Sequence, residues 1–204
     1  MRILLLTIIL SFGLSGHAQL LIAHQPIEQE PSYFISFDND TIYGEVEYGK
    51  KLFGGLLNKI IFTDDQGNIF KLRANESNGF SINGQHYRSK VIDDFYYFLR
   101  PAVSGSPALY YLEHNYVKRE SLPNQMIRMH GSYGRVIKSY VEMNGRMHKV
   151  YRKRFRKQAI GLFSAYPAVA DRIFEGELDF YDLEEIITYC NLINDGVVIS
   201  EFSK

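Results

Sequence analysis

A cluster of basic residues in the last third of the chain is the first candidate for a binding role. Seven Lys and Arg residues lie between Arg146 and Lys157, and no acid interrupts them. The cluster predicts either a face that contacts an anionic surface, such as lipid headgroups or acidic glycan, or a solvated surface partly paired with the acidic segment 171–185. Because the formal net charge of the chain is zero, the second interpretation is favoured. The candidate contact residues are Arg152, Lys153, Arg154, Arg156 and Lys157.

Side chains that could support hydrolysis are scattered along the sequence. The histidines beyond the first 18 residues are His24, His86, His114, His130 and His148. None has the His-Glu-x-x-His spacing of a zinc peptidase, and the chain contains neither a Gly-x-Ser-x-Gly nucleophile turn nor a glycine-rich phosphate loop. We therefore assign no catalytic, metal-binding or cofactor-binding residue. A hydrolase acting on envelope glycan or peptide is the alternative function, and it requires several histidines to converge with acidic groups in a pocket.

Carboxylate pairs, the single cysteine and the aromatic clusters each have a structural explanation. Asp64-Asp65 and Asp93-Asp94 are adjacent pairs, which point to opposite faces of a strand or fill turns, so they are not expected to act together on a substrate. Cys190 lies on the apolar side of a predicted helix and is expected to be a buried thiol. The aromatic segments 95–98 and 110–111 could stack on sugars, but core packing is the favoured interpretation.

The N-terminal residues predict an export signal. A short basic start precedes an apolar run, and Gly16 and Ala18 place small residues just before a cleavage site. We therefore predict a signal peptide at 1–18, cleavage near Ala18-Gln19, and a periplasmic or secreted protein. An uncleaved N-terminal anchor is the alternative. No later apolar run approaches the about 20 residues of a membrane-spanning helix, so no transmembrane segment is expected in the mature chain.

The larger part of the mature chain has the pattern of antiparallel strands. The Asn-Gly pairs at 83–84 and 144–145 favour two-residue hairpin turns, because both turn positions need a positive φ. The predicted hairpins span 33–48, 59–72, 80–88 and 135–151. The elements predicted between them are a strand at 91–99, a loop at 100–107, and strands at 108–112 and 116–119. This spacing predicts a meander that forms a sandwich or a small barrel.

The last quarter of the chain changes to helical spacing. Apolar residues recur at helical intervals over 152–166, and further helical patterns follow at 168–174 and after Asp179 or Asp182, either of which can cap the last helix. The predicted fold class is α+β, an antiparallel β meander followed by C-terminal helices. The predicted order is a signal peptide at 1–18, a flexible lead-in at 19–31, an antiparallel β region at 32–151, a helical region packed on it at 152–196, and a tail at 197–204.

Residues 35–46, with the sequence ISFDNDTIYGEV, resemble the opening hairpin of uncharacterised exported proteins of Bacteroidota. In that family a G-D-T-I-x-G hairpin follows the signal peptide, and a C-terminal helix ends in Tyr-Asn. Segments 79–90 and 187–191 are similar to later parts of the pattern, with Asn39 at the usual glycine and Cys190 between Tyr and Asn. The resemblance implies an exported envelope or periplasmic protein, and it implies no activity and no catalytic residue.

The segment Asp40-Thr41-Ile42 also resembles the short O-glycosylation motif of that phylum, which implies a glycan on Thr41; an ordinary hairpin turn is the alternative. The function expected overall is that of an exported cell-envelope protein acting as a non-enzymatic binding or structural module. Its expected partner is an envelope protein or glycan. The balanced charge gives no case for binding nucleic acid, and the oligomeric state is left open.

Overall fold

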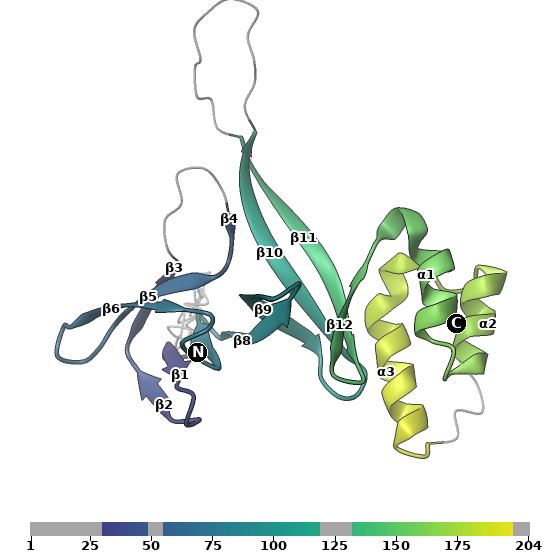
Figure 1. The fold of residues 1–204 in the computed structure, drawn as a ribbon, viewed down its shortest axis with the longest axis horizontal. Coiled ribbons are helices and arrows are strands. Elements are labelled where there is room, and N and C mark those ends of the chain that lie inside the picture. Colours follow the sequence, from purple (N-terminus) through teal and green to yellow (C-terminus); the bar gives the residue numbers. More distant parts are fainter. Residues whose placement is uncertain (1–29, 49–54, 119–131, 198–204) are drawn as a thin grey trace, which may run out of the picture.

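The structure is a computed structural model that describes residues 30–48, 55–118 and 132–197. The predicted signal peptide, most of the lead-in and most of the tail lie outside these residues. The described part is antiparallel sheet followed by helices, so the predicted α+β class is confirmed (Figure 1). In Figure 1 the helices lie together at one end of the molecule and the smaller of two sheets lies at the other.

The larger sheet is an antiparallel meander. Its strands pair in the order β2, β1, β7, β8, β9, β10, β11, β12, and β4 also pairs with β10. The bounds are β1 Tyr33–Ile35, β2 Thr41–Tyr43, β4 Gly55–Leu56, β7 Gly79–Ile82, β8 Gln85–Ile92, β9 Phe95–Val103, β10 Ala108–Lys118, β11 Ser132–Met143 and β12 Arg146–Val150. The two end strands of this described order, β2 and β12, do not pair with each other, so the sheet is open and the small-barrel form of the meander is not adopted.

A smaller sheet packs against the larger one. It contains β3 (Glu45–Tyr48), β5 (Lys59–Thr63) and β6 (Ile69–Arg73), paired in the order β3, β5, β6. The second half of the hairpin predicted at 33–48 is therefore divided at Gly44, with β2 in the larger sheet and β3 in the smaller one. A Cβ on Gly44 would collide with the Thr63 carbonyl oxygen and the Phe62 ring, so this close passage needs a residue without a side chain.

Two-residue turns fix the register of the meander. Asn83-Gly84 connects β7 to β8 and Asn144-Gly145 connects β11 to β12, and all four residues have a positive φ, as predicted. Asp93 and Asp94 form another turn with the same signs of φ, 48° and 66°. The single strand predicted at 91–99 is therefore wrong, because β8 ends before this turn and β9 begins after it.

The strands β10 and β11 form a long hairpin that projects from the body of the molecule (Figure 1). They pair continuously from Ala108↔Glu142 to Lys118↔Ser132. The separate strands predicted at 108–112 and 116–119 are therefore one strand. The preceding strand β9 continues to Val103, through part of the predicted loop, because it pairs with the start of β10. Both differences arise from pairing between distant residues, which a local pattern does not contain.

The helical region follows β12 directly. It consists of the 3₁₀ turn η1 (Arg152–Arg154), α1 (Phe155–Leu162), α2 (Pro167–Glu175), the 3₁₀ turn η2 (Phe180–Asp182) and α3 (Leu183–Asn194). Pro167 stands in the first turn of α2, and Gly176 ends that helix in the left-handed conformation. Asp179 caps η2 rather than α3: its carboxylate accepts from the Tyr181 amide, and the Asp182 carboxylate accepts from the Asp179 amide.

One apolar core joins the helices to the larger sheet. It includes Val169, Ile173, Ile186, Ile187 and Cys190 from the helices, and Leu109 and Val141 from β10 and β11. Cys190 is fully buried on the predicted apolar stripe. Burial raises the pKa of its thiol to about 12, so the thiol stays protonated and unreactive at neutral pH.

A second core holds the two sheets face to face. It includes Val46, Ile60 and Phe62 from the smaller sheet, and Phe80, Tyr87 and Phe98 from the larger one. The rings of Phe80 and Tyr87 are stacked with centroids 4.6 Å apart, and Phe98 meets Phe80 edge-on at 4.9 Å. The rings of Phe62, Phe80, Tyr87 and Phe98 are therefore used in packing the two sheets together.

Candidate functional site

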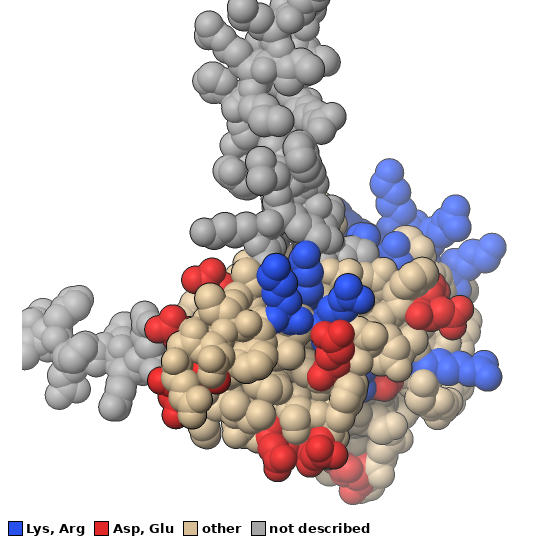
Figure 2. All heavy atoms as spheres, turned by 60° about the vertical axis from the view of Figure 1, so that its left-hand side comes forward, with Lys and Arg blue, Asp and Glu red and all other residues tan. Residues whose placement is uncertain are grey.

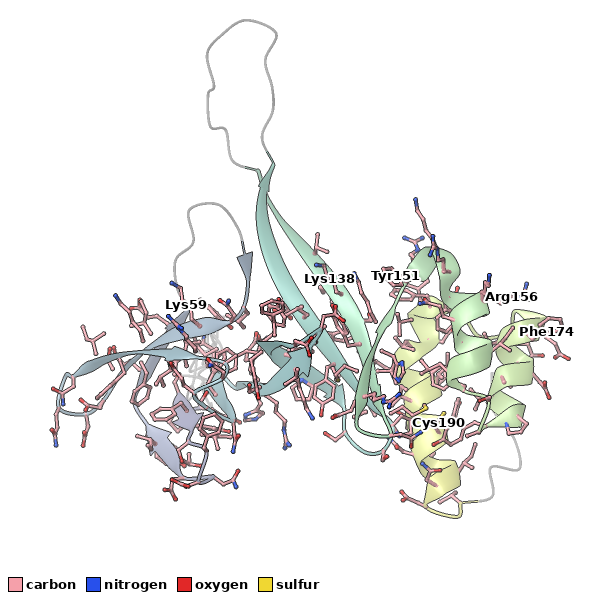
Figure 3. The ribbon with its side chains drawn as sticks, in the orientation of Figure 1. Lys59, Lys138, Tyr151, Arg156, Phe174 and Cys190 are labelled. Carbon is pink, nitrogen blue, oxygen red and sulfur yellow. The ribbon has the colours of Figure 1, made fainter. Side chains whose placement is uncertain are left out.

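The predicted basic residues come together in one groove at the helical end of the molecule. The groove has a volume of about 770 Å³ and lies between the η1–α1 segment and the segment 173–181. One wall carries Arg152, Lys153, Arg154, Arg156 and Lys157, and the other carries Phe174 and Tyr181. We call these seven residues the basic groove. Figure 3 shows Arg156 and Phe174 together at the outer side of the helices.

Two of the arginines are held by the aromatic wall. The guanidinium of Arg152 lies 4.8 Å from the centre of the Tyr181 ring, and that of Arg156 lies 5.8 Å from the centre of the Phe174 ring. Arg156 also donates from Nε to the Ile173 carbonyl oxygen at 3.2 Å and from Nη2 to the Phe174 carbonyl oxygen. These carbonyls belong to the last turn of α2, and that of Ile173 also accepts from the Gly176 amide at 3.2 Å. Arg156 therefore ties α1 to α2 as well as facing the groove.

The start of the helical segment adds further positive potential to the groove. Neither η1 nor α1 has a side-chain cap or an acidic residue in its first turn. The amide ends of a helix carry a partial positive charge, which normally attracts acidic side chains. Here the residues at this end are Arg152, Lys153 and Arg154. The sequence therefore places positive side chains at the positive end of the helix, where negative side chains would be favourable.

No described carboxylate forms an ion pair with these five cations. The ion pairs between described side chains join Lys90 to Glu142, Arg100 to Glu113 and Arg172 to Glu177. The acid that lines the groove is Asp179, whose carboxylate accepts from the Tyr181 amide. The partial pairing with segment 171–185 that the sequence suggested is therefore not made by the contact residues. Their charge is left facing solvent.

Exposed apolar side chains lie beside the cations. Phe174 and Tyr181 are 65% and 66% exposed, and Ile160 on α1 is 42% exposed. All five cations of the groove are exposed as well. A surface that combines aromatic rings with Lys and Arg can contact a boundary between apolar and anionic material.

The described histidines do not assemble a hydrolytic site. His86 on β8 shares a hydrogen bond of 2.9 Å with the Tyr33 hydroxyl, and His148 is exposed on β12. The side chain of His114, together with His24 and His130, lies outside the described residues. No group of three His, Cys, Asp or Glu side chains that could hold a metal occurs in the described ranges. The convergence that the hydrolase alternative needs is not found among the side chains that the structure places.

A half-buried polar network, which sequence reasoning missed, lies between the sheets. The Tyr87 hydroxyl donates to Gln85 Oε1 at 3.2 Å and accepts from the Tyr48 hydroxyl at 3.1 Å. Glu113 Oε2 lies 3.5 Å from the same Tyr87 hydroxyl, and Glu113 Oε1 pairs with Arg100 Nε at 3.0 Å. Burial, followed by the neighbouring hydroxyl, raises the pKa of Tyr87 well above its usual value. This tyrosine is therefore a neutral structural group, and the residues of the network come from four strands, β3, β8, β9 and β10.

Thr41 is exposed at the start of β2, an end strand of the described sheet order. Nothing in the structure tests its modification, which stays a prediction.

No model of a known protein family, no curated protein and no solved structure matches the chain. None of the described helices is long and apolar enough to span a bilayer. The chemistry of the basic groove is therefore the basis for the functional proposal.

Proposed function

We propose that the protein is an exported, non-enzymatic binding module of the cell envelope that attaches to an anionic membrane surface through the basic groove. The observation that carries this proposal is the arrangement of five exposed cations at an uncapped helix start without a described acidic partner. Such an arrangement is unfavourable in the free protein and becomes favourable when anionic headgroups approach.

The exposed apolar side chains of Ile160, Phe174 and Tyr181 support a membrane surface over a simple anion. A free phosphate would contact the cations and leave Phe174 and Tyr181 in water. At a membrane surface, Lys and Arg reach the headgroups while aromatic rings enter the interface below them. Each Lys or Arg near an anionic surface contributes about 1 kcal/mol. Lys153, Arg154 and Lys157, which form no described hydrogen bond or ion pair, would then contribute about 3 kcal/mol, roughly a 100-fold change in partitioning.

The location of the protein rests on separate support. The residues before Gln19 have the pattern of an export signal, and segment 35–46 resembles exported proteins of Bacteroidota. The basic groove would then hold the exported protein at the surface of the envelope membrane. This part of the proposal can be tested by fractionating cells and determining the N-terminal residue of the protein.

Sedimentation with vesicles tests the attachment. The purified protein is mixed with vesicles of phosphatidylcholine, with or without phosphatidylglycerol, at low and high salt. We expect binding only to the vesicles that contain phosphatidylglycerol, and release by salt. The triple variant Lys153→Gln, Arg154→Gln and Lys157→Gln should bind about 100-fold more weakly.

A matched variant controls for net charge. Lys71, Arg88 and Arg146 are exposed cations on the strands, and replacing these three by Gln removes the same charge. This control should bind anionic vesicles nearly as well as the original protein. Equal weakening by both triple variants would show that overall charge, rather than the basic groove, drives attachment, and the proposal would then be wrong.

A further inference from the structure

A second groove lies in the β part of the molecule. It has a volume of about 400 Å³ and lies between the base of the β5–β6 hairpin and the turn that joins β8 to β9. The residues used below are Asn58, Lys59, Arg73, Asn75, Asp94, Phe95 and Tyr96. We call them the sheet groove. Figure 3 shows Lys59 at the opposite end of the molecule from Arg156 and Phe174 of the basic groove.

Two cations face each other across the hairpin at this groove. Lys59 and Arg73 are direct cross-strand partners on β5 and β6, and both are exposed. Like charges in that position repel each other. Neither side chain takes part in an ion pair with a described carboxylate, although the Glu76 carboxylate accepts from the Arg73 backbone amide at 2.8 Å. Figure 2 shows several Lys and Arg side chains gathered in the upper part of the face that this view presents, with Asp or Glu side chains directly below them and along the margins. This pair of cations would be stabilised by an anionic group placed between them.

The groove also contains an aspartate, Asp94, at a turn position where two other hairpins of the chain have glycine. Gly84 and Gly145 stand at the second position of their turns, each with φ of 72°, and Asp94 stands at the equivalent position with φ of 66°. Glycine adopts this conformation more readily than any residue with a Cβ, although aspartate tolerates it better than most. The turn is therefore less stable with Asp94 than it would be with glycine. The side chain of Asp94 places a carboxylate at the groove, which glycine could not do.

Aromatic side chains next to the turn complete the groove. Phe95 is 66% exposed and Tyr96 is 46% exposed, whereas Phe98 and Leu99, further along the same strand, are fully buried. Of the aromatic cluster 95–98, the first two residues are thus not used by the core. Amide side chains at Asn58 and Asn75 stand at the same groove.

We propose that the sheet groove binds an acidic saccharide. The acid group of the sugar would lie between Lys59 and Arg73, where a carboxylate or phosphate relieves their mutual repulsion. An anion without hydroxyl groups would be repelled by Asp94, but the hydroxyl groups of a sugar can donate hydrogen bonds to that carboxylate and to the oxygens of the two amides. The apolar face of the sugar ring would then lie against Phe95 or Tyr96. A ligand with one acid, several hydroxyls and an apolar face satisfies all three kinds of side chain.

This proposal does not depend on the membrane attachment, because the two grooves share no residue. A protein with both would hold an acidic glycan at one end while the other end rests on a membrane. The two ligands differ in class, so the two sites can be tested separately.

Saturation-transfer difference NMR with trigalacturonate tests the sheet groove, and maltotriose serves as the neutral comparison. We expect transfer from the protein to trigalacturonate and much less to maltotriose. The variant Asp94→Gly should lose at least about tenfold in affinity, because a hydrogen bond to a charged acceptor is removed. The same variant should melt at an equal or higher temperature, since glycine suits the turn. A loss of binding therefore cannot be attributed to unfolding.

Two further variants make the assignment specific. The pair Lys59→Gln and Arg73→Gln should abolish the preference for trigalacturonate, whereas the triple Gln variant of Lys153, Arg154 and Lys157 should retain it. The proposal is overturned by an absence of transfer to trigalacturonate, by equal transfer to maltotriose, or by unchanged affinity in Asp94→Gly. Loss of binding in the basic-groove variant alone would place the saccharide at the other site and would also overturn it.

Discussion

Replacing Lys153 by Glu should stabilise the fold while weakening attachment to an anionic surface. Lys153 lies in η1, which runs directly into α1, and no acidic residue stands in the first turn of either. A favourable charge at a helix terminus contributes typically 0.3–1 kcal/mol, and an unfavourable one costs a similar amount. Exchanging one for the other should therefore raise the free energy of unfolding by about 1 kcal/mol.

Differential scanning calorimetry can measure this change. For a domain of this size, about 1 kcal/mol corresponds to a rise in melting temperature of roughly 2–4 °C. The gain should shrink at high salt, because the interaction is between exposed charges. Arg146→Glu is the matched control: it makes the same change in charge on an exposed residue at the far end of β12, away from the helix start.

The outcome decides whether the positive charge of the basic groove is uncompensated. If Lys153→Glu lowers the melting temperature relative to Arg146→Glu, a local partner must already balance Lys153. The reasoning that leads from unpaired cations to an anionic surface would then fail. If stability rises and vesicle binding falls together, the cations are retained at a cost to stability, as expected for a binding site.

Three further predictions concern the turn, the core and the buried thiol. Asp94→Gly should raise the free energy of unfolding by about 0.5 kcal/mol, measured by thermal denaturation. Glycine removes the steric cost of the left-handed conformation, and this gain exceeds the extra backbone entropy that glycine loses on folding. Ile186→Ala should lower it by about 3 kcal/mol in urea titrations, since this fully buried side chain joins α3 to the sheet; a change below 1 kcal/mol would contradict the described packing. The pKa of Cys190 rises from 9.0 to about 12 in the folded protein, so the stability from burying the neutral thiol is present below pH 9 and is lost between about pH 9 and 12. Cys190→Ala should therefore lose less stability than the original protein over that range.

Local sequence signals were enough to predict the elements whose cause is local. The turns at Asn83-Gly84 and Asn144-Gly145 were predicted because each pair prefers the φ values that it adopts. The helical stripe that contains Cys190 was predicted because its apolar spacing reflects one buried face. In each case the residues that carry the signal are the residues that form the structure.

Elements whose cause is distant in the sequence were missed. The division at Gly44 follows from the position of Phe62 and Thr63 on another strand, and the apolar–polar alternation of 41–48 continues through it. The turn at Asp93-Asp94 was hidden because aspartate is common in many turns and loops, and it carries no specific preference for this one. The full length of β10 is set by its pairing with β11.

The two grooves also differ in how much of each could be predicted from local sequence. The cations of the basic groove were predicted because they are clustered in the sequence, but the opposing wall of Phe174 and Tyr181 comes from separate elements and was missed. The sheet groove joins Lys59, Arg73 and Asp94, which are far apart in the chain.

The fluorescence of a single tryptophan tests the central proposal most directly. The chain has no Trp, so Tyr181→Trp would report only on the wall of the basic groove, and Tyr43→Trp would report on a similarly exposed ring on β2. On vesicles that contain phosphatidylglycerol, we expect Tyr181→Trp emission to shift to the blue and to be quenched by brominated lipid, with reversal at high salt, while Tyr43→Trp does not change. If the protein sediments with these vesicles and Tyr181→Trp emission stays at its value in water, the basic groove is not the surface that meets the membrane.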